Sequence, residues 1–216
     1  MRKNCSYSLS LAILALVACS RMSMADEMTV TVIDRDGEPV PDVAVYIDAP
    51  ASTESRAAGA TAVMDQVDTQ FVPHLLVIQK GTLVEFPNSD PIAHHVYSFS
   101  RPNDFMLPLY KGDVHAPITF EHAGVVTLGC NIHDHMLAYI LVVDGPRYGK
   151  TDADGKVTLD VGGLADASVT IWSPRIRPRG EALTQAVQNG AVEFRITGRL
   201  RAPHGDESRG IEWTDY

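Results

Sequence analysis

Cysteine is scarce in this chain, with only three among 216 residues. Cys5 and Cys19 stand near the N-terminus, so Cys130 is the one cysteine in the rest of the sequence. A single thiol can form no internal disulfide, which excludes a small disulfide-stapled domain. In an oxidising compartment a lone thiol is either buried and inert or bound as a metal thiolate. The neighbours of Cys130 decide between these two interpretations.

The sequence also lacks an apolar run long enough to cross a membrane. The run from Leu9 to Ala18 has about ten residues, whereas a bilayer core needs about twenty. It follows a basic N-terminus and precedes small and polar residues, which is the order of a secretory signal. We predict a signal peptide over residues 1–25, export to the bacterial periplasm and no transmembrane segment in the mature protein. The alternative is a lipobox ending at Cys19, which would then carry a lipid anchor.

Basic residues are few relative to acidic ones. The chain has 18 Lys and Arg against 27 Asp and Glu, a formal net charge of −9. The predicted signal peptide contains three of the basic residues and no acidic ones, so its removal makes the charge more negative. This balance argues against nucleic acid as a partner. It favours a salt-sensitive encounter with a basic patch on another protein.

Helical periodicity is almost absent. Short apolar runs alternate with Gly, Pro, Asn and Asp along the chain, as in an all-β sandwich or barrel. The one helix that we expect is short and covers Glu181 to Gln188, which are rich in Ala, Leu and Gln. The predicted fold class is therefore all-β.

Two hairpin-like pieces flank the middle of the chain. Residues 32–45 and 151–159 each contain an Asp-Gly turn, and together they resemble the halves of a carboxypeptidase-regulatory or transthyretin-like β-sandwich. The resemblance implies that a second β domain is inserted into a loop of this outer sandwich. The predicted boundaries are 26–61 and 145–200 for the outer sandwich, 62–144 for the inserted domain and 201–216 for a flexible tail.

The loop after the apolar run 125–128 carries three potential metal ligands. Cys130, His133 and Met136 place a thiolate, an imidazole and a thioether three residues apart. Thiolate and thioether favour Cu(I), and imidazole accepts either oxidation state, so this set suits copper. Methionine is not among the usual ligands of zinc, which are Cys, His, Asp and Glu.

A fourth donor must come from another strand, and His94 follows an apolar run and a loop at the start of the next one. One upstream histidine, then Cys-x-x-His and Met before a final strand, resembles the blue-copper cupredoxins, with the spacing of amicyanin and a shorter loop than that of plastocyanin. The resemblance implies a Greek-key cupredoxin sandwich that binds one copper ion, Cu(I) or Cu(II), through His94, Cys130, His133 and Met136. The combined motifs also resemble envelope proteins labelled methylamine-utilisation proteins.

Several of these assignments have alternatives. Met136 could fill the core instead, and His135 could complete the site in its place, although two residues beyond His133 it should face away. His95 stands where the family has an asparagine that braces the cysteine loop. Asn88 could brace a ligand loop or simply occupy a turn.

The function implied is that of a one-electron carrier in the bacterial envelope. Its partner would be an envelope redox protein or a dehydrogenase that donates or accepts the electron. The chain shows no nucleophilic serine motif, no plausible pair of catalytic carboxylates and no phosphate loop, so we expect no enzyme. One alternative is a periplasmic copper chaperone or copper-holding docking protein. Another is a reactive thiol at Cys130 with His133 as its base.

Overall fold

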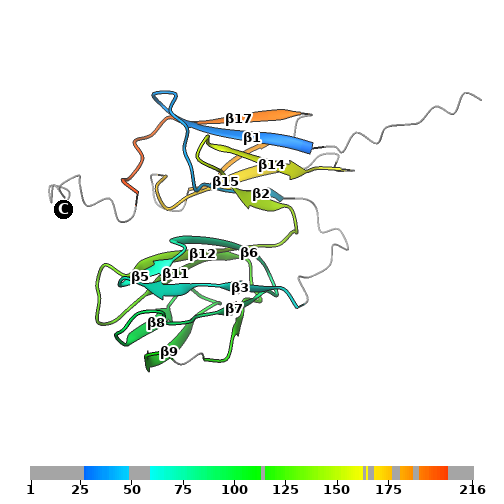
Figure 1. Ribbon diagram of the computed structural model, residues 1–216. Coiled ribbons are helices and arrows are strands. Elements are labelled where there is room, and N and C mark those ends of the chain that lie inside the picture. The colour runs from blue at the N-terminus through cyan, green and yellow to red at the C-terminus, as the bar shows by residue number, and fades with distance from the viewer. Residues whose placement is uncertain are drawn as a thin grey trace, which may run out of the picture.

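The computed structural model describes residues 27–48, 59–112, 115–162, 164, 168–176, 181–186 and 190–203. This part of the chain is all-β, as the sequence predicts, and forms two β-sandwiches that lie one above the other in Figure 1. No helix in these ranges combines the length and the apolar character needed to cross a membrane. The predicted signal peptide with Cys19, and residues 204–216 of the predicted tail, lie outside the described residues.

The outer sandwich consists of strands from both ends of the chain. One of its sheets has the order β14-β1-β17 and the other the order β13-β2-β15-β16. The strands are β1 (Glu27–Asp34), β2 (Ala44–Asp48), β13 (Tyr148–Lys150), β14 (Lys156–Asp160), β15 (Ser168–Trp172), β16 (Leu183–Ala186) and β17 (Ala191–Ile196). Alternate residues of β1, namely Met28, Val30 and Val32, are fully buried in the core between the two sheets. This period of two is what one buried sheet face requires.

Two aspartates fix the turns of this sandwich. Asp34 accepts hydrogen bonds from the backbone N–H groups two and four residues later, and Asp152 does the same in its own turn. Gly37 and Gly155 take the positive φ angles that the turns need, 89° and 69°. The turns predicted in both pieces are therefore confirmed.

The helix expected over residues 181–188 is wrong for residues 181–186, and residues 187 and 188 lie outside the described residues. Leu183 to Ala186 form β16, which pairs antiparallel with β15 from Ile171↔Leu183 to Ser168↔Ala186. The helical propensity of Ala, Leu and Gln is worth only fractions of a kcal/mol per residue, and an available sheet edge overrides it.

The central sandwich lies between β2 and β13 in the sequence. Its larger sheet has the order β6-β12-β11-β8-β9 and its smaller one the order β10-β7-β3, with a separate hairpin β4-β5 beside them. The strands are β3 (Thr61–Val63), β4 (Asp65–Val67), β5 (Gln70–Val72), β6 (Leu75–Gln79), β7 (Leu83–Glu85), β8 (His94–Ser98), β9 (Phe105–Tyr110), β10 (Ile118–Thr119), β11 (Gly124–Gly129) and β12 (Leu137–Val143). The exact residue boundaries of the two domains stay a prediction.

Strand β12 is buried on both faces. One face, with Ala138 and Ile140, belongs to the core of the central sandwich, and the other, with Tyr139 and Leu141, packs against Ala44 and Trp172 of the outer sandwich. A strand covered on both sides needs a continuous apolar run rather than an alternating one. The two sandwiches therefore share a packed interface.

Candidate metal centre

Three potential ligands converge at one end of the central sandwich. His94 is the first residue of β8, Cys130 directly follows β11, and His133 lies in the loop before β12. Their ligating atoms all lie within 4.8 Å of one another. His94 Nδ1 is 3.1 Å from His133 Nδ1, and Cys130 Sγ is 3.8 Å from His133 Nδ1. Predicted ligands that are 36 and 39 residues apart in the sequence are thus neighbours in space.

These separations fit a bound metal ion. A metal with bonds of about 2.0 Å to nitrogen and about 2.3 Å to sulfur needs donors roughly 3 to 4 Å apart. His94 is 0% exposed and Cys130 is 5% exposed, whereas His133 is partly exposed. Two imidazoles and a thiolate in a buried position form the donor set of mononuclear copper sites. The residues present therefore fit copper.

Met136 lies at the end of the loop that carries Cys130 and His133. Its backbone N–H donates a 3.0 Å hydrogen bond to the carbonyl of His133, and its side chain is 1% exposed. It packs in the same buried cluster as Cys130. Its position is compatible both with a core residue and with a fourth donor, and ligation by Met136 stays a prediction.

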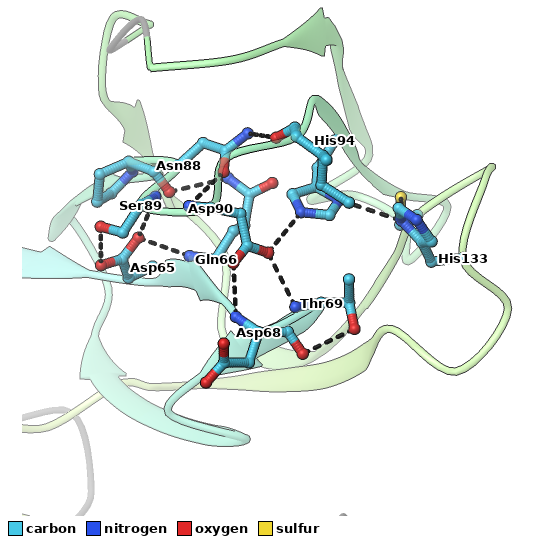
Figure 2. A network of polar contacts seen from close by, with 12 residues as sticks. Asp65, Gln66, Asp68, Thr69, Asn88, Ser89, Asp90, His94 and His133 are labelled. Atoms are coloured by element: carbon cyan, nitrogen blue, oxygen red, sulfur yellow. Dashed lines mark hydrogen bonds and ion pairs between the residues drawn. The ribbon is translucent and has the colours of Figure 1, made fainter.

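The second nitrogen of His94 is fixed by a carboxylate. Asp90 Oδ2 lies 2.7 Å from His94 Nε2, and both side chains are buried (Figure 2). An ionised carboxylate can only accept, so a neutral His94 carries its proton on Nε2. Its Nδ1 then presents a lone pair toward His133 and Cys130, as a metal ligand must.

Asp90 is itself held in place by backbone donors. The N–H groups of Asp68 and Thr69 donate to its two oxygens at 2.6 and 2.8 Å (Figure 2). Burial alone would raise the pKa of this carboxyl, but the hydrogen bonds from Thr69, His94 and Asp68 outweigh it and lower the pKa below its usual value. Asp90 is therefore the ionised acceptor that the tautomer of His94 requires.

Asn88 braces the loop that carries Asp90. Its amide donates to the carbonyls of Ile92 and Tyr110, both at 2.9 Å, and its oxygen accepts from Asp90 N–H at 3.0 Å. Of the two roles open in the sequence, bracing the ligand loop is the one observed. Gln66 and Tyr110 extend the network, because Gln66 donates to Tyr110 and to Pro87 O.

The two further histidines of the ligand loops also have partners. His95 Nδ1 lies 3.1 Å from Asn131 Nδ2, so His95 contacts the cysteine loop. His135 points to another element, since its Nε2 lies 3.1 Å from Thr69 Oγ1. His135 is not among the three clustered donors.

Comparisons with known proteins found similarity to solved structures only at low sequence identity. No protein-family model and no curated protein matches the chain. Among solved structures, a reduced tryptophan-to-tyrosine mutant of amicyanin is 21% identical, with a TM-score of 0.37, and the match covers 45% of this chain and 99% of that one. The reduced Cu(I) form at pH 4 of another amicyanin mutant has the same identity and coverage and a TM-score of 0.36.

A Cu-containing nitrite reductase from Thermus scotoductus also matches. It is 23% identical, with a TM-score of 0.38, over 52% of this chain and 28% of the reductase. At such values the case for a metal site rests on the residues themselves. In the structure His94 opens a strand, and the cysteine loop joins the antiparallel strands β11 and β12, as the resemblance implies. The central sandwich, which contains these strands, is cupredoxin-like.

Two parts of this candidate site could not be recognised in the sequence. Asp90 stands four residues before His94, a spacing that could have marked it, but it reads as an ordinary loop acid before a proline. Nothing in the sequence around Thr69 marks it as part of the site. Its contacts with Asp90 and His135 span 21 and 66 residues of sequence.

Proposed function

We propose that this protein binds one copper ion through His94, Cys130 and His133, with Met136 as the fourth donor, and carries single electrons in the bacterial periplasm. The observation that carries the proposal is the convergence of two imidazole nitrogens and a cysteine sulfur within 4.8 Å. Bound copper would supply a centre that gains and loses one electron at a time.

The chain's own residues prepare this site. Asp90 keeps the proton of His94 on Nε2, so that Nδ1 is available without rearrangement. The buried positions of His94 and Cys130 keep water away from two of the donors. Donors that are held by the fold need little reorganisation when the charge of a bound ion changes, which is what a carrier requires.

A role in electron transfer explains this donor set better than a catalytic role does. Catalytic metal sites keep a position open for substrate, whereas four protein donors close the site. The acidic balance of the chain, with a net charge of −9, favours a redox partner from the envelope that presents a basic patch.

The visible spectrum with one equivalent of Cu(II) tests the proposal. We expect the purified mature protein to show a strong sulfur-to-copper charge-transfer band and Cys130→Ser to lose it. His122→Asn, at an exposed histidine outside the site, is the matched control and should keep the band, whereas Met136→Leu should shift it. If the wild-type protein shows no such band, the copper proposal fails.

The chaperone alternative differs in how the protein releases Cu(I). A carrier should cycle reversibly between the two oxidation states without losing the ion, and buried donors favour this. A chaperone should give Cu(I) up readily to a competing chelator. Rapid loss on reduction, together with the charge-transfer band, would favour the chaperone.

A further inference from the structure

The turn between β4 and β5 has an unusual backbone for its sequence. Asp68 and Thr69 form a two-residue turn, closed by the pair Val67↔Gln70, and both have positive φ angles, 51° and 57°. Such turns favour Asn-Gly or Asp-Gly, because glycine takes this conformation without strain. A β-branched threonine at positive φ is an outlier that something else must hold in place.

The backbone of this turn supports the first histidine. The N–H groups of Asp68 and Thr69 both point at the carboxylate of Asp90, and the oxygen that accepts from Thr69 also accepts from His94 Nε2 (Figure 2). Asp65, at the start of β4, accepts from Ser89 Oγ at 2.8 Å and so ties the hairpin to the same loop. The turn is therefore hydrogen-bonded to the same carboxylate that fixes the ring of His94.

The side chain of Thr69 contacts the loop of the second histidine. Its Oγ1 donates to the carbonyl of Asp68 at 2.7 Å, so the lone pairs remain to accept from His135 Nε2 at 3.1 Å. This fixes the proton of a neutral His135 on Nε2. His135 is two residues beyond His133, and the two rings lie 6.0 Å apart. One residue thus contacts a partner of His94 and the loop of His133.

We propose that Thr69 is a positioning residue for the copper site, which holds the loops of His94 and His133 at a fixed separation. The inference rests on the proposed function for its role toward copper. Thr69 acts on the proposed donors indirectly, through its contacts with Asp90 and His135. A glycine here would relieve the strain and keep the N–H donor to Asp90, but it would lose the hydroxyl that contacts His135.

Two substitutions separate the contacts of Thr69 from its bulk. Thr69→Val keeps the shape and the N–H to Asp90 but removes the hydroxyl, and Thr69→Ser keeps both contacts. Thr29→Val, which removes an exposed hydroxyl on the outer sandwich, is the matched control. Melting temperatures of the four proteins show whether each variant is folded.

The first readout is the tautomer of His135 in the metal-free protein, from nitrogen-15 NMR at one fixed pH. We expect wild type, Thr69→Ser and Thr29→Val to show the Nε2–H form, and Thr69→Val to show a mixture. The second readout is the release of Cu(I) to a chelator, which should be several-fold faster in Thr69→Val alone. Identical tautomers and release rates in Thr69→Val and wild type would overturn the inference.

The outcomes also separate this inference from the copper proposal. If wild type shows the charge-transfer band and Thr69→Val behaves like wild type, copper stands and the role of Thr69 fails. If wild type shows no band while Thr69→Val disturbs the resonances of His135 and His94, Thr69 holds the two loops and the copper proposal fails.

Discussion

The carboxylate of Asp90 sets the chemical form of a proposed ligand. It accepts a hydrogen bond from His94 Nε2 at 2.7 Å. Replacing it with asparagine would remove the negative charge of the acceptor. We expect Asp90→Asn to weaken Cu(II) binding about 10- to 100-fold, the usual effect of removing a hydrogen-bond partner of a metal-bound histidine. Competition with a chelator of known affinity measures this. Asp134→Asn, at an exposed acid beside His133, is the control, and equal losses in both variants would contradict the assignment.

The buried hydroxyl of Tyr110 should make the folded protein less stable at alkaline pH. Burial, with a smaller contribution from Asp65, raises the pKa of its hydroxyl to about 12. Because the folded state holds this proton more tightly, the stabilisation is complete below pH 10 and is lost as the pH rises toward 12. We expect the free energy of unfolding to fall by about 2 kcal/mol over this range.

Tyr110→Phe should show a smaller alkaline decrease, because it has no hydroxyl to ionise. It should also be less stable at neutral pH, since the hydroxyl donates to Phe86 O and accepts from Gln66. Urea denaturation at neutral pH and at about pH 11 gives both quantities. The same alkaline decrease in both proteins would show that other groups cause it.

Single residues also show why the site could be predicted only in part. The proposed donors Cys130, His133 and Met136 share one short loop, so their chemistry and spacing are visible in the sequence. The contacts of Asp90 depend on where the fold places a hairpin 21 residues away. A local sequence pattern cannot reveal such a contact, so the role of Thr69 could not be predicted from the sequence.

At the level of elements, β11 ends beside the candidate metal site in a glycine that packs against a side chain of β8. A Cβ on Gly129 would lie 2.8 Å from the ring of Tyr97, on the neighbouring strand. We expect Gly129→Ala to cost about 1 kcal/mol, the low end of the usual penalty for overpacking, because the atoms it meets are the tip of a partly exposed side chain that can shift. It should also shift the charge-transfer band, because Gly129 directly precedes Cys130.

A second substitution tests whether this clash is the cause. Tyr97→Ala removes the ring, so the double variant with Gly129→Ala should regain part of the loss. Chemical denaturation of the four proteins yields the coupling between the two sites. Strictly additive effects would mean that Gly129 matters for another reason, such as its backbone freedom.

The strands themselves were more predictable than the helix. Alternation and punctuation predict the all-β class, and β1 and β8 show the expected period of two in their burial. Residues Leu183 to Ala186 instead take their conformation from pairing with β15. Pairing with a strand that precedes them by many residues cannot be read from four side chains.

In the whole molecule, the two sandwiches are joined through one buried face. Trp172 is 3% exposed, and its ring lies 5.7 Å from that of Tyr139 on β12. The hydrogen bond from Lys150 Nζ to Leu75 O, at 2.9 Å, adds a polar link between the sandwiches. The continuous apolar run of β12 predicts a strand buried on both faces, but not which partner covers the second one.

This shared face should make the two sandwiches unfold together. Trp172→Ala removes the largest side chain that β15 contributes to it, a loss of about 3–5 kcal/mol for a buried aromatic residue. We expect calorimetry to show one transition for the wild type and two for this variant, with the charge-transfer band intact at low temperature. Ile171→Ala is the matched control, because its side chain points from the same strand into the core of the outer sandwich. It should lower stability without separating the transitions, and a single transition in Trp172→Ala would show that other contacts couple the sandwiches.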